Sequence, residues 1–311
     1  MADAGGPGSR LSADEVHSGF VALVGRPNAG KSTLINALAG SKVAIVSDKP
    51  QTTRHRLRAI VDTEDAQVVF VDTPGLHKPL DALGEQLNRS ALLALSDVDV
   101  ACLVIDSTKP VGEGDKWVAR HVAAAKGAKV LVLTKADLPY RIPIERRIES
   151  ARGLAEFDDI VVLSALEDFN VAGFLSTVTR LLPLGPRYFP REMATDQSLE
   201  VMLAEFVREK VLLRTRDEIP HSVGVSIEDV THDDKNAMTT VVAVIYVERD
   251  SQKGIIIGAG GEGIRSIGVE ARADLEKLLG SKVFLDLQVR VKKDWRRDAS
   301  QIKRFGYGEG L

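Results

Sequence analysis

The chain has 311 residues, a mass of 33.7 kDa and a formal net charge of −3, which suits one large domain or two ordinary ones. Hydrophobic residues make up 44% of the sequence and charged residues 27%, so disorder throughout the chain is excluded. A single cysteine excludes an internal disulfide and a cysteine-based zinc site, and it favours a reducing compartment such as the cytoplasm. No apolar run approaches the ~18 residues of a membrane span, and the glycine-rich start is unlike a signal peptide.

The first half of the chain alternates apolar strands with amphipathic helices. After a flexible tail over residues 1–18, we expect strands at 20–24, 68–72, 98–106, 129–134 and 160–164. These runs are almost continuously apolar, as strands covered by helices on both faces must be. Helical periodicity between them, at 32–39, 83–94 and 115–125, predicts an α/β domain with a doubly wound, mostly parallel sheet over residues 19–182.

A proline-rich linker over residues 183–197 separates the two halves, because residues 183–190 hold three prolines and a glycine. The second domain, 198–305, has a predicted helix at 198–216 and strands at 223–230 and 239–248. A short apolar run at 255–257, a helix at 264–279 and a strand at 282–291 follow, with a tail at 306–311. This α-β-β-α-α-β order, with a glycine loop between the last two helices, is the layout of a prokaryotic-type (type II) KH domain, an α+β fold.

A phosphate-loop pattern, G-x-x-x-x-G-K-[ST], stands between the first strand and the first helix. Its glycines let backbone N–H groups surround phosphates, and the helix N-terminus adds its positive end. We predict that Lys31 reaches the β- and γ-phosphates and that the Ser32 hydroxyl binds Mg²⁺. A glycine turn that merely opens a helix is the alternative, but it does not require Lys and Ser at these positions. The candidate phosphate-binding residues are Gly25, Arg26, Pro27, Asn28, Ala29, Gly30, Lys31 and Ser32.

Four further motifs follow in the order that this chemistry needs: Thr53, Asp72-Thr73-Pro74-Gly75 with Leu76, Thr134-Lys135-Ala136-Asp137, and Ser164-Ala165. Asp72 ends a strand, where its carboxylate can hold a Mg²⁺-bound water, and the hydroxyl of Thr53 can bind the same ion. The Gly75 amide can meet the γ-phosphate. The Asp137 carboxylate can accept two hydrogen bonds from guanine that adenine does not offer, and a backbone amide at Ser164-Ala165 suits guanine O6. The sequence therefore predicts a guanine-nucleotide site, with Lys31, Thr53 and Gly75 assigned to hydrolysis.

Leu76 stands where Ras-like enzymes carry the glutamine that orients the attacking water. We therefore expect slow basal hydrolysis, controlled by a partner or a bound cation. His77 follows, but a histidine beside a mobile loop is more often solvated, and we do not assign it to catalysis. Asn28 has two open interpretations: its side-chain oxygen binds K⁺ against the phosphates, or it only braces the loop. The six histidines show no metal-ligand spacing, so no protein-held metal cluster is expected.

The C-terminal segment is locally basic, with seven basic and two acidic residues between 290 and 304. Trp295 lies among them, and Phe305 and Tyr307 follow closely. Positive charge for phosphates and aromatic rings for bases are typical of single-strand RNA binding. By itself the segment could equally be a solvated basic end, but beside a KH layout RNA binding is favoured. The candidate RNA-binding residues are Gly258, Ala259, Gly260, Gly261, Arg265, Lys292, Lys293, Trp295, Arg296 and Arg297.

The chain resembles the Era family of GTPases, on residues 25–32, 51–55, 72–77 and the KH segment 253–297, with support from 217–222 and 246–249. The resemblance implies a GTPase that uses GTP, GDP and Mg²⁺, with K⁺ as the activator in cation-dependent relatives. It also implies binding of the 3′ end of 16S ribosomal RNA and a role in assembly and maturation of the 30S subunit. It further implies a mainly cytoplasmic protein with some peripheral association with the membrane, and we expect a monomer.

Two positions depart from the family pattern. Thr134 replaces an Asn that reaches guanine N7 and braces the phosphate loop, so we expect guanine selectivity to persist through Asp137 at lower affinity. The glycine loop lacks the usual basic residue between Gly258 and Gly261, so its backbone clamp has no electrostatic help. The loops at 51–58 and 76–83 flank groups that meet the γ-phosphate, and we expect them to change the orientation of the KH domain across the linker.

Four alternatives come from other functional classes. A metabolic P-loop kinase or ATPase would lack Asp137 and carry a substrate lid in place of a KH domain. A nucleotide-gated RNA-binding module with little hydrolysis stays open, whereas the intact Lys31, Ser32, Asp72 and Asp137 argue against a passive module with a vestigial nucleotide fold. A GTPase switch with a different RNA target stays open.

Overall fold

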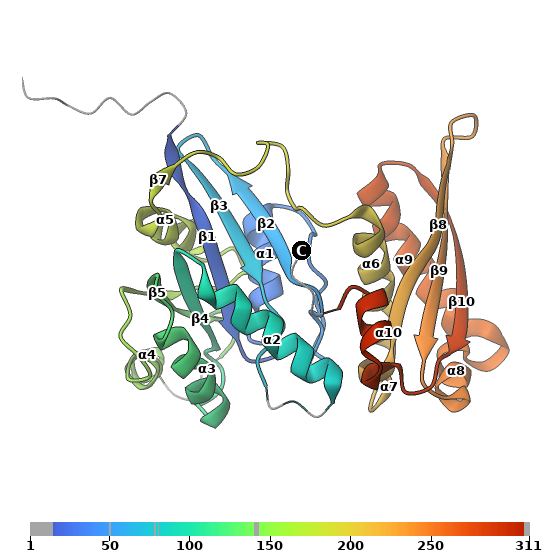
Figure 1. Cartoon of the computed structure of the whole chain (residues 1–311), viewed down its shortest axis with the longest axis horizontal. Helices are drawn as coiled ribbons and strands as arrows, with labels where there is room; N and C mark the ends of the chain where they lie inside the picture. Colours follow the sequence, from blue (N-terminus) through green and yellow to red (C-terminus); the bar gives the residue numbers. More distant parts are fainter. Residues whose placement is uncertain (1–14, 50, 78, 80, 140–142, 308–311) are drawn as a thin grey trace, which may run out of the picture.

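The structure is a computed structural model that describes residues 15–49, 51–77, 79, 81–139 and 143–307. Figure 1 shows two lobes side by side: a larger one that begins with β1, and a smaller one that begins with α6. An extended segment joins them along the top of the view. Residues 1–14 of the expected tail lie outside the described residues.

The larger lobe is built on a sheet with strand order β2-β3-β1-β4-β5-β6. Its strands are β1 (Val16–Gly25), β2 (Leu57–Asp62), β3 (Ala66–Asp72), β4 (Val100–Asp106), β5 (Ala128–Thr134) and β6 (Asp159–Val162). β2 pairs antiparallel with β3, and the other neighbours in this order are parallel. The predicted doubly wound α/β fold is confirmed, but the edge strand β2 was not predicted, and β1 begins at Val16, four residues before the predicted start.

Helices cover both faces of this sheet: α1 (Lys31–Ala39), α2 (Ala82–Ser96), α3 (Glu113–Ala123), α4 (Ile144–Arg152) and α5 (Val171–Leu181). Alternate residues of β1 point to opposite faces, as the strand pleat requires. Val21 and Leu23 belong to the core that contains residues of α1 and α5, whereas Ala22 and Val24 belong to the core of α2 and α3. Because both faces are buried, the strands read as continuous apolar runs in the sequence.

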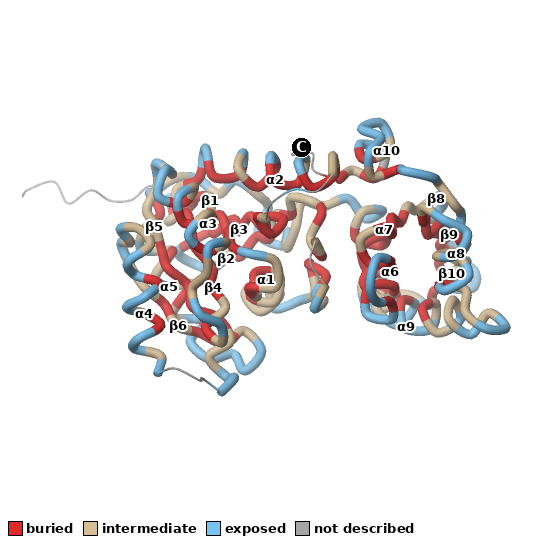
Figure 2. Tube along the Cα trace, turned by 90° about the horizontal axis from the view of Figure 1, so that it is seen from below, coloured by how far each residue is buried: buried red, intermediate tan, exposed pale blue. Residues whose placement is uncertain are grey.

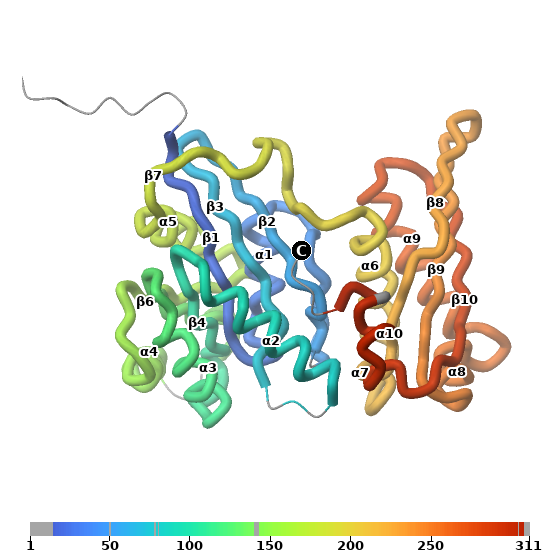
Figure 3. The backbone as a smooth tube through the Cα atoms, viewed as in Figure 1, coloured from blue at the N-terminus to red at the C-terminus, as the bar shows by residue number. Residues whose placement is uncertain are grey.

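The segment between the lobes is fixed to the larger lobe at its start. β7 (Leu184–Gly185) pairs antiparallel with the first residues of β1, and Ser18 N donates to Pro183 O at 3.0 Å. Arg187 forms an ion pair with Asp62 at 3.2 Å. Residues 16–18, expected in the tail, therefore belong to the sheet, and the first part of the expected linker pairs with the start of the central strand β1 (Figure 3).

The smaller lobe has a sheet of order β10-β9-β8, with β9 antiparallel to β8 and parallel to β10. Its elements are α6 (Leu199–Arg214), α7 (Ile219–Ser222), β8 (Gly224–Asp233), β9 (Met238–Val247), α8 (Asp250–Ile257), η1 (Ala259–Gly261), α9 (Glu262–Leu279), β10 (Lys282–Val291), η2 (Trp295–Arg297) and α10 (Ala299–Arg304). Apolar residues of α6 and α9, among them Phe206, Val207 and Ala271, pack on Val241 and Ala243 of β9. The predicted α+β KH layout is confirmed.

The lobes meet along two contacts. Helix α6 lies beside the loop that follows α1, and helix α2 lies beside η2 and α10. Leu83 and Leu87 of α2 share an apolar cluster with Trp295, Phe305 and Tyr307 of the smaller lobe, and Figure 2 shows the buried stretch of α2 continuing toward α10. Tyr307, expected in a free tail from residue 306, is therefore buried in this cluster. Residues 308–311 lie outside the described residues.

Candidate nucleotide site and RNA-binding surface

The phosphate loop leaves the end of β1 and enters α1 through backbone conformations that favour glycine. Gly30 has φ +91°, and a Cβ atom there would lie 3.3 Å from the Thr134 hydroxyl oxygen. Gly75, in the loop after β3, approaches so closely that a Cβ atom would lie 2.6 Å from the Pro27 nitrogen. Leu76 N donates to Gly25 O at 3.2 Å. The loop after β3 is thus fastened to the phosphate loop, and both turn toward one cavity.

Lys31 is buried inside the phosphate loop. Its ammonium donates to the carbonyl oxygens of Gly25, at 3.3 Å, and Arg26, at 3.1 Å. Burial lowers the pKa of Lys31, and the charge of Asp72 opposes that shift. An anion in the loop would therefore be attracted by an ammonium that has lost most of its water.

Three oxygen ligands gather beside this lysine. The Ser32 hydroxyl donates to Asp72 Oδ2 at 2.7 Å, and the Thr53 hydroxyl donates to the same oxygen at 3.3 Å. The two hydroxyl oxygens lie 2.9 Å apart. Burial raises the pKa of Asp72, opposed by Lys31 and by these hydrogen bonds, and its fully buried Oδ1 makes no hydrogen bond to any described residue. Two hydroxyls and a carboxylate that keeps one oxygen unpartnered are hard oxygen donors of the kind that Mg²⁺ prefers, so the residues present fit this ion.

The Thr134–Asp137 segment braces the phosphate loop from the other side. The Thr134 hydroxyl donates to Ala29 O at 2.7 Å, and Lys135 Nζ donates to Asn28 O at 2.8 Å. Lys135 also pairs with Asp106 at 2.7 Å. The Thr134 hydroxyl therefore makes a bracing contact of the kind that the family's asparagine was expected to make.

Asp137 lies at the exposed edge of the site and accepts a hydrogen bond from the Ser164 hydroxyl at 2.6 Å. The structure thus brings together the two motifs predicted to recognise the base, Asp137 and Ser164-Ala165. One carboxylate oxygen is engaged by Ser164, which orients the group.

A cavity of about 410 Å³ opens beside the phosphate loop, while Asp72, Asp137 and Ser164 lie outside its lining. Its lining comprises Pro27, Asn28, Gly30, Lys31, Ser32, Thr33, Ile45, Val46, Ser47, Asp48, Gln51, Thr52, Thr53, Gly75, Lys109 and Lys135. Its size suits a small-molecule ligand. Residues 45–48 also contribute to the wall, although no sequence motif predicted them. Asn28 belongs to it too, and its amide nitrogen donates to Asp48 O, which ties the phosphate loop to that wall.

Leu76 and His77 have structural partners. Leu76 is buried in the core that contains Ala91 of α2 and Val118 of α3. His77 is half-buried: its Nδ1 lies 2.9 Å from Gly75 O and its Nε2 lies 2.8 Å from the Gln51 side-chain nitrogen. The expectation of a merely solvated histidine is wrong, because His77 links the loop after β3 to the loop that carries Thr53.

The predicted glycine loop of the KH domain joins α8 to α9. Gly258, Gly260 and Gly261 all have positive φ, at +73°, +59° and +80°. A Cβ atom on Gly258 would lie 2.8 Å from Gly263 N, so the two helices approach closely at this point. Ala259, Gly260 and the following Arg265 are exposed. The loop therefore presents backbone groups and one cation at the surface.

The C-terminal candidates do not all lie at the surface. Lys293 and Arg297 are exposed and Lys292 is half-buried. Trp295 is fully buried and donates through its indole N–H to Ser222 O at 2.9 Å. Arg296 bonds to Glu248, at 2.9 Å, and to Asp81 of the larger lobe, at 3.2 Å. The expectation that Trp295 stacks on a base is therefore wrong for this conformation, because its ring is in the contact with α2.

Comparison with known proteins agrees with the arrangement of two lobes. The family model for 50S ribosome-binding GTPases matches residues 20–135, and the KH-domain model matches residues 218–296. GTPase Era of Staphylococcus epidermidis is 41% identical over 295 residues, which cover 95% of this chain and 98% of that protein. The chain belongs to the Era family of GTPases.

Two solved Era structures match the chain over both domains. An Aquifex aeolicus Era variant bound to GDP·AlF4⁻ has a TM-score of 0.89 and 37% identity and covers 94% of this chain and 99% of its own. An Era complex with MgGDPNP and nucleotides 1506–1542 of 16S ribosomal RNA has a TM-score of 0.90 and 36% identity, with the same coverage of 94% and 99%. In the described part of this Era-family chain, no helix has the length and apolar character needed to cross a bilayer.

Proposed function

We propose that this Era-family GTPase binds GTP and GDP with Mg²⁺, hydrolyses GTP slowly and binds the 3′ end of 16S ribosomal RNA during assembly of the 30S subunit. The observation that carries the nucleotide part is the set of Ser32, Thr53 and Asp72 oxygens beside the buried Lys31. The complex of a 36% identical Era with nucleotides 1506–1542 of 16S ribosomal RNA supports the RNA part. The family resemblance also favours a cytoplasmic monomer with some peripheral membrane association.

Each part of the nucleotide site has a role in this proposal. The loop amides and Lys31 hold the phosphates, Asp137 reads guanine, and Ser32, Thr53 and Asp72 hold Mg²⁺. When bound, Mg²⁺ supplies positive charge against the phosphates. The Gly75 amide donates toward the γ-phosphate, and Leu76, buried in the core, cannot orient water by a side-chain hydrogen bond. A slow basal rate follows from that last feature.

RNA binding is assigned to the backbone of the loop at residues 258–261, of which Ala259 and Gly260 are exposed, and to the cations Arg265, Lys292, Lys293 and Arg297. A backbone clamp at such a loop holds the sugar-phosphate chain. Trp295 and Arg296 join this surface only where the contact with α2 is released. The loop carries no cation between Gly258 and Gly261, and Glu262 follows it, so a GTPase switch with a different RNA target is the second candidate.

Crosslinking to cellular RNA followed by sequencing tests the proposal. The full chain is crosslinked with GDP and with a non-hydrolysable GTP analogue, and recovered fragments are mapped. Enrichment of the 3′ end of 16S ribosomal RNA in either state is expected. Enrichment of another RNA selects the second candidate, and no ribosomal enrichment in both states overturns the assembly role. Hydrolysis of GTP but not ATP, abolished by chelation of Mg²⁺, is the parallel test of the nucleotide site.

A further inference from the structure

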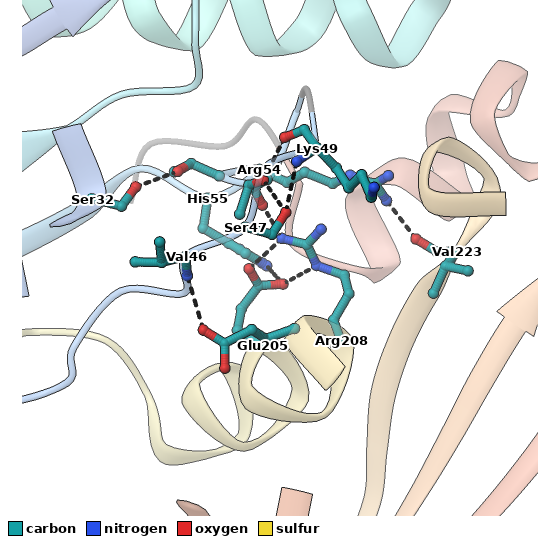
Figure 4. Close-up of polar contacts among 12 residues, drawn as sticks. Ser32, Val46, Ser47, Lys49, Arg54, His55, Glu205, Arg208 and Val223 are labelled. Carbon is teal, nitrogen blue, oxygen red and sulfur yellow. Dashed lines mark hydrogen bonds and ion pairs between the residues drawn. The ribbon is translucent and has the colours of Figure 1, made fainter. Parts of the chain in front are cut away.

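The loop that carries Thr53 is held by the KH domain. We define the threonine loop as residues 46–49 and 51–55. Residues 46–48 and 51–53 of this loop line the cavity, and the loop faces α6 (Figure 4). Val46 N donates to Glu209 Oε1 of α6 at 2.9 Å. Near the start of the loop, Lys42 pairs with Glu209 and with Asp274 of α9. The first part of the threonine loop is thus anchored to α6, and the segment just before it is anchored to α6 and α9.

Stronger contacts flank Thr53 itself. Arg208 of α6 is fully buried and donates to the main-chain oxygen of Thr52, the residue before Thr53. Its guanidinium is oriented by Glu205, with Nε donating to Oε1 at 2.7 Å and Nη2 to Oε2 at 2.6 Å. Figure 4 shows both side chains rising from α6 toward the threonine loop.

Arg54, the residue after Thr53, reaches into the KH domain. It is fully buried and donates to the carbonyl oxygens of Val223, at 2.6 Å, Pro220, at 3.1 Å, and His221, at 3.0 Å. Next to it, His55 Nε2 lies 3.5 Å from Glu205 Oε1. The main chain is therefore fixed to the KH domain on both sides of Thr53, while the Thr53 hydroxyl contacts Ser32 and Asp72.

The buried charges make this contact specific. Burial disfavours ionised Glu205, but Arg208 and His55 outweigh that effect and hold the pKa of Glu205 well below its usual range. Burial, followed by the charge of Arg208, lowers the pKa of Arg54 to about 10, so Arg54 stays a cation at neutral pH. Removal of one member leaves an uncompensated buried charge, which is costly. The buried charges of Arg54, Glu205 and Arg208 accordingly favour this one conformation of the threonine loop over others.

We propose that Arg54, Glu205 and Arg208 are positioning residues for Thr53, so that the KH domain places the Thr53 hydroxyl in the Mg²⁺ site. The inference rests on the proposed nucleotide function, and it adds that the KH domain of the same chain helps to form the Mg²⁺ site. A loop that is already ordered loses less conformational freedom when the nucleotide and Mg²⁺ bind. The coupling is reciprocal, because any nucleotide that strengthens the Thr53 contact must also strengthen docking of the KH domain. The contacts at Thr52 and Arg54 lie in the segment 51–58, one of the two loops that the sequence predicts to change the orientation of the KH domain.

The test compares Arg208→Ala with Arg214→Ala in the full-length chain. Arg214 lies on the same helix but pairs with Glu270 of the KH domain, so it controls for loss of a cation from α6. The first readout is hydrogen exchange of the amides of residues 52–55 without nucleotide. We expect at least tenfold faster exchange in Arg208→Ala and no change in Arg214→Ala. Equal exchange in the two variants overturns the proposal.

The second readout is the affinity for a GTP analogue and for GDP, each titrated with and without Mg²⁺. We expect Arg208→Ala to reduce the Mg²⁺-dependent preference for the GTP analogue by about tenfold, with little effect on GDP without Mg²⁺. If Arg208 acts through Thr53, Arg208→Ala has no further effect in a Thr53→Ala background. Full additivity of the two substitutions overturns the proposal.

Separate controls test whether each variant folds and whether the proposed nucleotide function holds. Thermal unfolding checks each variant, and Arg54→Ala, which removes the contact from the other lobe, replaces Arg208→Ala if that variant does not fold. Failure of the wild-type chain to bind guanine nucleotides overturns the proposed function. If the wild-type chain binds guanine nucleotides but Arg208→Ala and Arg54→Ala behave like Arg214→Ala, only this inference is overturned.

Discussion

The phosphate loop of the GTPase domain (residues 25–32) and the glycine loop of the KH domain (residues 258–261) are both glycine turns that open a helix. The first is braced by other segments of the chain, through Thr134 on Ala29 O and Lys135 on Asn28 O. The second is built between its own helices and leaves Ala259 and Gly260 exposed. Similar backbone geometry therefore produces a preformed cavity for a small charged ligand in one case and an open surface for a long polymer in the other.

The two loops also differ in whether their basic side chains are buried or exposed. In the phosphate loop, Lys31 is buried and shielded from salt, so its interaction with a phosphate is strong. At the glycine loop, Arg265 is exposed, and its attraction for a phosphate is screened at physiological ionic strength. We expect nucleotide binding to depend steeply on single side chains and RNA binding to depend on many small contributions.

The largest effect is expected for Lys31→Ala. Loss of a buried cation aimed at the phosphates should lower GTP hydrolysis by about 10²–10³-fold. Single-turnover hydrolysis measures this, with the exposed Lys116→Ala, which loses only a surface pair with Glu113, as the charge-matched control. A loss below about fivefold would show that the loop amides alone hold the phosphates.

Asp137→Asn should exchange base preference, with the ratio of GTP to XTP affinity changing by about 100-fold. The Ser164 hydroxyl donates to one Asp137 oxygen, and an Asn at this position can still accept that bond through its own oxygen. Its amide NH₂ is then available for the carbonyl that xanthine carries in place of the guanine amino group. Competition binding with both nucleotides measures the ratio, and a wild-type ratio in the variant would remove Asp137 from base recognition.

Two opposite substitutions at Ala259 should change RNA affinity in opposite directions. Ala259→Asp should weaken binding to the 3′ end of 16S ribosomal RNA about fivefold, and Ala259→Lys should strengthen it by a similar factor, because one charge is added near phosphates. Titration at two salt concentrations measures both effects, and the Lys variant should show the steeper salt dependence. Guanine-nucleotide affinity, which should not change, is the control. If both variants bind the RNA as tightly as the wild type does, the RNA does not contact the loop at Ala259.

The smallest effect concerns K⁺. We expect K⁺ to stimulate hydrolysis several-fold more than Na⁺, and Asn28→Ala to abolish the difference, if the Asn28 oxygen binds the ion beside the phosphates. The amide nitrogen of Asn28 already donates to Asp48 O, so a bracing role is visible in the structure. Turnover in matched KCl and NaCl separates the two roles. A cation effect that is absent in the wild type, or unchanged in Asn28→Ala, leaves Asn28 with the bracing role.

Apart from Thr53, which lies in the loop before β2, the motifs of the nucleotide site were predictable because each is a short run of sequence at the end of a strand. Carboxyl ends of neighbouring parallel strands meet at one edge of the sheet, so β1, β3 and β5 deliver residues 25–32, 72–75 and 134–137 to the same place. The type of fold followed from continuous apolar strands and from the order of helices and strands. Edge strand β2 (LRAIVD) was missed although it is mostly apolar, because its first residues fall in the 51–58 segment that was interpreted as a mobile loop.

Only the tertiary structure decided the burial and the contacts of residues whose partners are far away in the sequence. Trp295 is an aromatic residue in a basic segment, which predicts an RNA contact, yet it is buried against α2. Arg54 bonds to Val223, which is 169 positions away in the sequence. A sequence shows a charge beside an aromatic ring but not whether another domain will cover them. The sequence therefore determined the nucleotide site and both folds, which depend on local pattern and strand order. The contact between the domains, which depends on shape and charge matching of two finished surfaces, was decided by the tertiary structure.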